Sequence, residues 1–216
     1  MDYRLLLFSQ PLFSIHRPEQ GVTGLQTQTL AVRTLVEFTL HGDDITRIGD
    51  IRSMQDGMLG HKARQAALSS GWRSEVPLKA EIVLDDLALT LVLTGRMDAF
   101  LDGVLPVVEE IKLWQGKDAP TAPYPAHQAQ ALCYAWMLFQ DRPLLESVQT
   151  QVVYVTRKGK VRGVFPETFT RDSCDTNFHA LLDPYLRRLR AMRSHREARD
   201  NVLQSLAFPF PTYRPG

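Results

Sequence analysis

VVEEIKLW, residues 107–114, carries two carboxylates and a lysine inside a run whose other members are apolar and favour a β-strand. Side chains alternate between the two faces of a strand, so Glu110 and Lys112 share one face while Ile111 points to the other, where it can pack in a core. Taken alone, Glu-x-Lys is more often a salt bridge on a solvated sheet face. Whether this pair belongs to a functional site therefore depends on the other motifs near it in the sequence.

The stretch LTGRMDAF, residues 93–100, ends the strand that precedes this one, and FLDG, residues 100–103, is typical of a turn. A hairpin through that turn would bring Asp98 near Glu110. Two neighbouring carboxylates repel each other unless a positive charge separates them, and a divalent cation with oxygen ligands is the usual solution. Such a cation can lower the pKa of a water, and Lys112 can orient that water and offset charge on a phosphate.

Four motifs follow one another in an order that is similar to that of a known family. GMLGHKARQ contains His61 after a glycine, GRMDAF contains Asp98, VVEEIKLW contains Glu110 and Lys112, and HQAQALCY contains Gln130 and Tyr134. This order resembles the RecB-like branch of the PD-(D/E)XK nuclease superfamily, with its His, Asp, Glu-x-Lys and Gln-x-x-x-Tyr elements. The resemblance covers roughly residues 61–134. Each element alone is weak, but the four in order are specific.

The resemblance implies an α/β fold with a restriction-endonuclease-like core, a mixed central sheet flanked by helices. It also implies a divalent-metal-dependent deoxyribonuclease whose metal is Mg²⁺ or Mn²⁺. The implied metal ligands are His61, Asp98, Glu110 and the backbone carbonyl of Ile111, while Lys112 positions water and Gln130 and Tyr134 complete the catalytic site. The role of Gln130 and Tyr134 remains open between two alternatives. They complete the catalytic site, as the resemblance implies, or they are an ordinary pair on a helix surface, since they lie four residues apart.

Two other glutamates lie near the motifs in the sequence. Glu75, in WRSEVPL, precedes a predicted strand and fits an accessory acid, although an exposed glutamate at a strand start needs no special role. Glu109 neighbours Glu110 but points to the opposite face of the strand, which makes it a poor substitute as metal ligand.

Periodicity and turn residues predict one domain of alternating elements. Helices are predicted at residues 30–40, 54–70 (ending at Gly71) and 126–140, and in a long basic tract broken or started at Pro184. Strands are predicted at residues 3–8, 76–83, 87–97, 104–114, 148–156 and 161–169, with a loop at residues 10–29. The second, third and fourth of these strands are expected to form an antiparallel meander.

The basic tract DPYLRRLRAMRSHREARDNVL, residues 183–203, sets Leu186, Leu189 and Met192 at helical spacing. A solvated helix face, with its arginines paired to Asp and Glu, is the slightly favoured interpretation. The alternative is a phosphate-contacting surface whose binding weakens with salt, formed by Arg187, Arg188, Arg190 and Arg193.

The final residues AFPFPTYRPG, 207–216, resemble the entry segment of DinG/XPD-type helicases. This implies a nuclease domain at residues 1–207 and the start of a truncated helicase domain or a linker at 208–216. No G-x-x-x-x-G-K-[ST] motif is present, so no helicase activity is expected within these 216 residues. The expected partners are DNA, single-stranded because a helicase would deliver it, and a C-terminal helicase domain in a longer chain.

The composition excludes several classes of protein. A net charge of +1 leaves nucleic-acid binding to local patches, and two cysteines are too few for a four-cysteine iron–sulfur cluster or a disulfide framework. No targeting signal or membrane span is predicted, so a cytoplasmic protein is expected. Besides the nuclease, a catalytically inactive DNA-binding or scaffolding module that assists a helicase motor remains a candidate. A stand-alone restriction-type endonuclease is a third possibility.

Overall fold

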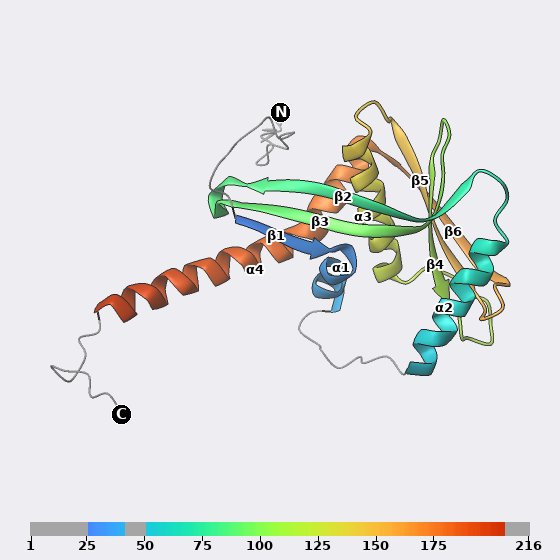
Figure 1. Cartoon of the computed structure of the whole chain (residues 1–216), viewed down its shortest axis with the longest axis horizontal. Coiled ribbons are helices and arrows are strands. Elements are labelled where there is room, and N and C mark those ends of the chain that lie inside the picture. The colour runs from blue at the N-terminus through green and yellow to red at the C-terminus, as the bar shows by residue number, and fades with distance from the viewer. Residues whose placement is uncertain (1–25, 42–50, 206–216) are drawn as a thin grey trace, which may run out of the picture.

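The computed structural model describes residues 26–41 and 51–205, which form a mixed six-stranded sheet flanked by helices (Figure 1). The strands are β1 (Gln26–Ala31), β2 (Trp72–Leu84), β3 (Leu89–Leu101), β4 (Val107–Leu113), β5 (Ser147–Val155) and β6 (Val161–Thr170). The helices are α1 (Val32–His41), α2 (Ile51–Ala66), α3 (Pro125–Asp141) and α4 (Arg171–Ser205). The expected α/β class is confirmed.

β3 organises the sheet, because it pairs with three strands although a strand has only two edges. β2 pairs antiparallel with β3 along its whole length and so occupies one edge. β1 then pairs parallel with residues 89–94 on the other edge, and β4 pairs antiparallel with residues 99–101 farther along that same edge. Residues 95–98 of β3 therefore lie in a gap between β1 and β4. The expected meander of β2, β3 and β4 is confirmed.

The two faces of β4 and β5 are covered by different helices. On one face Ile111, Val153 and Val155 form a buried cluster beneath α2, where a Cβ on Gly60 would lie 3.1 Å from the Thr156 carbonyl oxygen. On the other face Val152 and Tyr154 pack with Ala131 of α3. Because neighbouring residues of β4 point to opposite faces, Glu109 faces α2 and Glu110 faces α3.

α3 lies at the centre of the main core. Ten of its residues are buried. It contacts α4 through Trp136, whose ring stacks on that of Phe178 with the centroids 3.9 Å apart. α4 is buried only in its first half, through Cys174, Phe178, Leu181, Leu182 and Leu186. Residues 191–205 are all exposed, and this half of α4 extends away from the sheet (Figure 1). None of the described helices combines the length and apolarity needed to cross a membrane.

Several predicted boundaries were wrong. Residues 26–29 belong to β1 and not to a loop; their alternating Gln and Thr residues gave no apolar pattern because β1 is largely exposed. Residues 85–87 form a 3₁₀ turn, followed by Ala88 in the left-handed region with φ of 46°, so β3 starts later than expected. Pro184 lies inside α4, which neither breaks nor begins there. The predicted strand at residues 3–8 and the loop at residues 10–25 lie outside the described residues.

A buried ion pair holds α2 on the sheet. Arg64 donates from Nε to Glu109 Oε1 at 2.7 Å and from Nη2 to Oε2 at 2.9 Å, and Gln151 Nε2 donates to Oε2 at 2.6 Å. The Glu109 side chain has no exposed surface. Its charge is stabilised in the interior because a fork of two parallel hydrogen bonds and an amide satisfy both oxygens.

We expect Arg64→Ala to lower the free energy of unfolding by about 3 kcal/mol, because it leaves the Glu109 carboxylate buried without a cation. Urea unfolding followed by circular dichroism measures this change. Arg33→Ala is the matched control, since Arg33 pairs with Glu37 on an exposed helix surface and its loss should cost less than about 0.5 kcal/mol. Equal effects of the two substitutions would contradict a structural role for the buried pair.

Candidate active site

Asp98 lies in the gap of β3, where β4 leaves the sheet edge. Backbone pairing between β3 and β4 ends at Ala99 and Glu109, yet the Ile111 N–H donates to Asp98 Oδ2 at 2.7 Å. A backbone donor that has lost its strand partner is thus satisfied by a side chain. This interaction fixes the Asp98 carboxylate beside the Glu-x-Lys segment, as the predicted hairpin required.

Glu110 and Lys112 form a close pair on the α3 side of β4. Lys112 Nζ lies 2.6 Å from Glu110 Oε1, and the two side chains are 24% and 4% exposed, so this is not a bridge on a solvated sheet face. Among the described residues, Glu110 Oε2 is one of two buried side-chain oxygen or nitrogen atoms without a hydrogen-bond partner. Burial raises the pKa of Glu110 to about 7, and Asp98 adds to this, while Lys112 and His61 oppose it.

His61 reaches the same region from α2. Its Nδ1 lies 3.6 Å from Asp98 Oδ1, and both side chains are partly buried. Arg64 lies one turn later on the same helix face and is bound to Glu109, so the ion pair that holds α2 also sets the position of His61. The structure therefore brings the predicted His61, Asp98 and Glu110 together.

Tyr134 is packed into the gap from the other side of the sheet. A Cβ on Gly95 would lie 2.5 Å from Tyr134 Cε1, so only glycine leaves room for this ring. Burial raises the pKa of the Tyr134 hydroxyl, and the carboxylates of Glu110 and Asp98 raise it further. Gln130 lies one turn earlier on α3, and its Oε1 is buried without a partner. Both side chains are less than 10% exposed, which excludes a surface pair.

Two further residues at the site, Gly95 and Gln65, are found only in the structure. Gly95 makes room for Tyr134, as described above, and Gln65 of α2 donates from Nε2 to the Asp98 carbonyl oxygen and to Glu75 Oε1, each at 2.8 Å. Gln65 lies four residues after His61, a spacing that places both on one helix face. This four-residue spacing in GMLGHKARQ is the sequence feature from which Gln65 could have been predicted as a site residue.

Glu75 lies next to the site without entering it. The residue has a left-handed backbone with φ of 56°, and it is skipped in the pairing of β2 with β3, as Asp98 is on the opposite strand. Its carboxylate is held by Gln65 and by Arg96 Nε at 2.6 Å. Glu109, by contrast, points to the face opposite Glu110, as predicted; there it faces α2, and Arg64 and Gln151 bind both of its oxygens.

Asp98, Glu110 and His61 are the side chains that could bind a metal at this site. No three His, Cys, Asp or Glu side chains within residues 26–41 and 51–205 are arranged to hold an ion by themselves. Asp98 and Glu110 nevertheless offer two carboxylates close to one imidazole, and Glu110 Oε2 is buried without a donor. Hard divalent cations take oxygen ligands and retain several waters, so these donors are of the types that Mg²⁺ and Mn²⁺ use, and a cation bound here remains a prediction.

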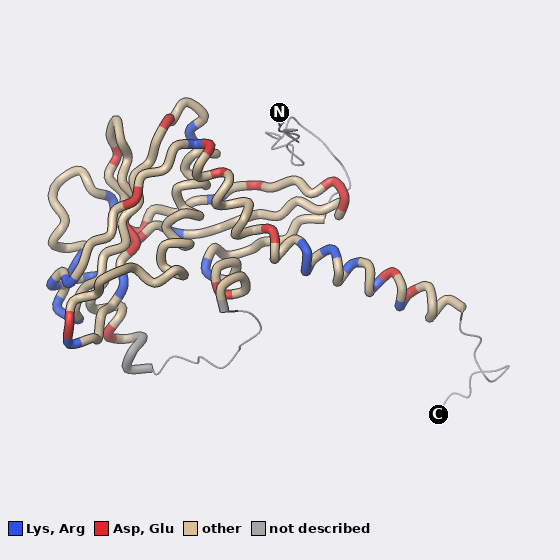
Figure 2. The backbone as a smooth tube through the Cα atoms, turned by 180° about the vertical axis from the view of Figure 1, so that it is seen from behind, with Lys and Arg blue, Asp and Glu red and all other residues tan. Residues whose placement is uncertain are grey.

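The arginines of α4 lie at a different end of the molecule. Arg190 Nε pairs with Asp86 at 2.7 Å, beside the turn that joins β2 and β3. From Leu89 to Asp98 the strand spans roughly 30 Å. Arg187 pairs with Asp183, and Arg193 Nε pairs with Glu197 at 2.8 Å. Several arginine positions follow one another along α4 in Figure 2, and Asp and Glu positions lie beside them farther along the helix. The ion pairs agree with the favoured interpretation of this tract.

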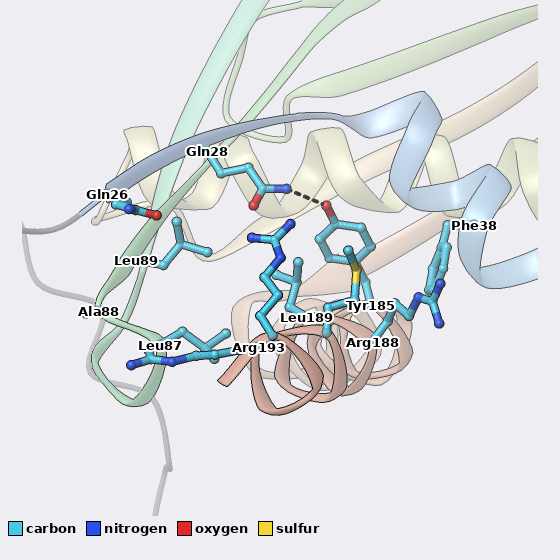
Figure 3. Close-up of a pocket in the computed structure, with 12 residues that line it drawn as sticks. Gln26, Gln28, Phe38, Leu87, Ala88, Leu89, Tyr185, Arg188, Leu189 and Arg193 are labelled. Carbon is cyan, nitrogen blue, oxygen red and sulfur yellow. Dashed lines mark hydrogen bonds between the residues drawn. The ribbon is translucent and has the colours of Figure 1, made fainter. Parts of the chain in front are cut away.

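A pocket of about 690 Å³ lies in this arginine-bearing region and not at the acidic residues (Figure 3). Arg188 and Arg193 line one side, and Leu87 and Leu89 of the β2–β3 ribbon line another. Across it, Gln28 Nε2 donates to the Tyr185 hydroxyl at 3.0 Å. Arg188 has no carboxylate partner among the described residues, unlike Arg187, Arg190 and Arg193.

Comparison with known proteins gives only distant likeness. No family model and no curated protein matches the chain. The solved structure of SSO0001 is 17% identical over 84% of this chain and 79% of that chain, with a TM-score of 0.48. A structure titled "Putative exonuclease", from Eubacterium rectale, is 14% identical over 75% of this chain and 60% of that chain, with a TM-score of 0.37. At this level of similarity, neither structure assigns a function to the chain.

We expect Glu110→Gln to stabilise the metal-free protein at high pH. The folded Glu110 holds its proton up to about pH 7, whereas its ordinary pKa is 4.5, so ionisation lowers the free energy of unfolding as the pH rises between these values. The neutral amide removes this penalty. Relative to wild type, the variant should gain on the order of 3 kcal/mol between pH 4.5 and 8, measured by urea unfolding in EDTA. The exposed Glu146→Gln controls for loss of a surface charge, and a pH-independent difference for Glu110→Gln would contradict the prediction.

Proposed function

We propose that this protein is a metal-dependent nuclease that hydrolyses DNA phosphodiester bonds. The observation that carries the proposal is Glu110: its carboxylate is buried beside that of Asp98, one oxygen is held by Lys112, and the other has no donor. Burying an ionisable group in this way costs folding free energy. Carboxylates whose pKa is raised by burial and by a neighbouring acid are concentrated at functional sites.

The residues have complementary roles in the proposed reaction. His61, Asp98, Glu110 and the Ile111 carbonyl would hold the cation, which when bound supplies positive charge and a water of lowered pKa. Lys112 carries its ammonium group on the same face and would orient the attacking water and offset charge on the phosphate oxygens. The water oxygen bonds to phosphorus and gives up a proton, while the bond from phosphorus to the leaving oxygen breaks and that oxygen takes a proton. Gln130 and Tyr134 would keep Lys112 and the strand in place.

Single-stranded DNA is the proposed substrate, delivered by a helicase domain of a longer chain. The support for delivery by a helicase is the likeness of residues 207–216 to the entry segment of DinG/XPD-type helicases. Residues 206–216 lie outside the described part of the chain, so the division at residue 207 remains a prediction, as does the cytoplasmic location.

Cleavage of a labelled single-stranded oligonucleotide in Mn²⁺ tests the proposal. We expect Lys112→Ala and Asp98→Asn to lower the cleavage rate at least about 100-fold, because each removes charge or ligand at the reacting phosphate. Lys79→Ala is the matched control: Lys79 pairs with Glu81 on an exposed part of β2, and its loss should leave the rate unchanged.

The outcomes separate the candidate functions. Metal-dependent cleavage that is lost in both site variants and kept in the control supports the nuclease. Salt-sensitive DNA binding with no cleavage by the wild type overturns it and favours the inactive DNA-binding module. Cleavage that survives in Lys112→Ala would place the chemistry elsewhere.

The arginine tract is proposed as a second, sequence-independent contact with phosphates. Ion pairs with carboxylates are formed by Arg187, Arg190 and Arg193. Arg188 forms none within the described residues. Arg188→Ala should therefore reduce the slope of log affinity against log salt by about 1, and Arg187→Ala by less. Fluorescence anisotropy over a salt series measures both slopes, and an unchanged slope in both variants would contradict a phosphate contact by this tract.

A further inference from the structure

β4 continues beyond Lys112 to an aromatic side chain on the same face. The Trp114 N–H donates to the Val155 carbonyl oxygen at 2.8 Å, which extends the pairing with β5 by one more residue. Side chains on one face recur every second residue, so Glu110, Lys112 and Trp114 form a row with a spacing of about 7 Å. The indole is therefore the next side chain in line after the proposed catalytic lysine.

Trp114 belongs to an ordered aromatic cluster. Its ring lies 5.3 Å from that of Tyr154 at 66° and 6.1 Å from that of Tyr124 at 32°, measured between centroids. The indole Nε1 donates to the Asp118 carbonyl oxygen at 2.6 Å, and a Cβ on Gly116 would lie 2.7 Å from the indole. The orientation of the indole is thus held from its edge and from one side.

Tyr124 gives this cluster its exposed surface. It is 55% exposed, although its backbone N–H donates to the Tyr154 hydroxyl at 2.8 Å and it directly precedes α3. A large aromatic side chain left open to water on a fixed backbone contributes little to the core. It offers a preformed flat surface at low entropic cost to a ligand.

The charges around the cluster favour an anionic ligand. Arg162 Nη2 donates to the Lys117 carbonyl oxygen at 2.6 Å, which brings a guanidinium to the loop that follows Trp114. Neither of these residues, nor Lys160 near the start of β6, forms an ion pair with a carboxylate in the described part of the chain, in contrast to most arginines of α4. Lys and Arg gather at this end of the molecule in Figure 2.

We propose that Trp114 and Tyr124 form a stacking site for an unpaired nucleobase of the strand whose phosphate lies at Lys112, with Lys117 and Arg162 contacting the neighbouring backbone. This inference rests on the proposed nuclease function and specifies its substrate as a single strand. Aromatic faces stack on any exposed base, whereas the bases of a duplex are stacked on one another and unavailable. The 7 Å step from Lys112 to Trp114 is comparable to one nucleotide of an extended strand.

Binding without cleavage tests the site. Fluorescence anisotropy in EDTA would compare a labelled dT12 with an abasic oligomer of the same length and charge, for the wild type, Tyr124→Ala and Trp114→Leu. We expect the wild type to prefer dT12, and each variant to lose about 5- to 100-fold in affinity for dT12 with less than about twofold change for the abasic oligomer. Trp114→Phe should keep most of the affinity, because it keeps an aromatic face.

Trp72→Leu is the matched control, since Trp72 is also partly exposed but pairs with Leu101, near the opposite end of β4. Circular dichroism melts verify that each variant folds, and Tyr124→Ala decides the question if Trp114→Leu does not. Equal wild-type affinity for the two oligomers, or equal losses for both in Tyr124→Ala, would overturn the stacking site. Base-dependent binding without cleavage in Mn²⁺ would keep the stacking site and overturn the nuclease, whereas cleavage with base-independent binding would do the reverse.

Discussion

The hydrogen bond from the Ile111 N–H to the Asp98 carboxylate is the contact on which the site depends. β1 and β4 share one edge of β3, so the sheet must open where one ends and the other begins. At this opening some backbone groups lose their partners on the neighbouring strand, and in the interior they need another hydrogen-bond partner. Asp98 satisfies one of them, and in doing so it is held at the point where helices from both faces approach.

Successive residues of β4 show how the same chemical group serves two purposes. Glu109 accepts three hydrogen bonds from Arg64 and Gln151, and its charge is fully satisfied. Glu110 has Lys112 on one oxygen and no partner on the other, and its pKa is raised. The first carboxylate joins α2 to the sheet. The second retains unsatisfied binding capacity, which is the property expected of a ligand site.

Charge is also divided between two regions with different character. Along α4 most arginines have an acidic neighbour on the same helix or on the β2–β3 turn, so the helix is close to neutral at short range. Lys117 and Arg162, near the acidic site, have no such partner among the described residues. These two side chains can therefore attract an anionic strand near the proposed chemistry, since no carboxylate of the described residues neutralises them.

Most residues of the candidate site could be predicted from the sequence, although Gly95 and Gln65 were not. The spacing of Glu110 and Lys112 sets their shared face, and the order of the motifs marked His61, Asp98, Gln130 and Tyr134. It also predicted the meander and the α/β class, because alternation and helical periodicity are local properties of the chain. The three-dimensional fold was needed to show that Glu110 is buried, that Gly95 makes room for Tyr134, that β1 is a strand, and that the arginines of α4 lie far from the acids. These depend on which segments meet across the sheet, and the type of a charged, glycine or polar residue does not reveal which distant segment packs against it.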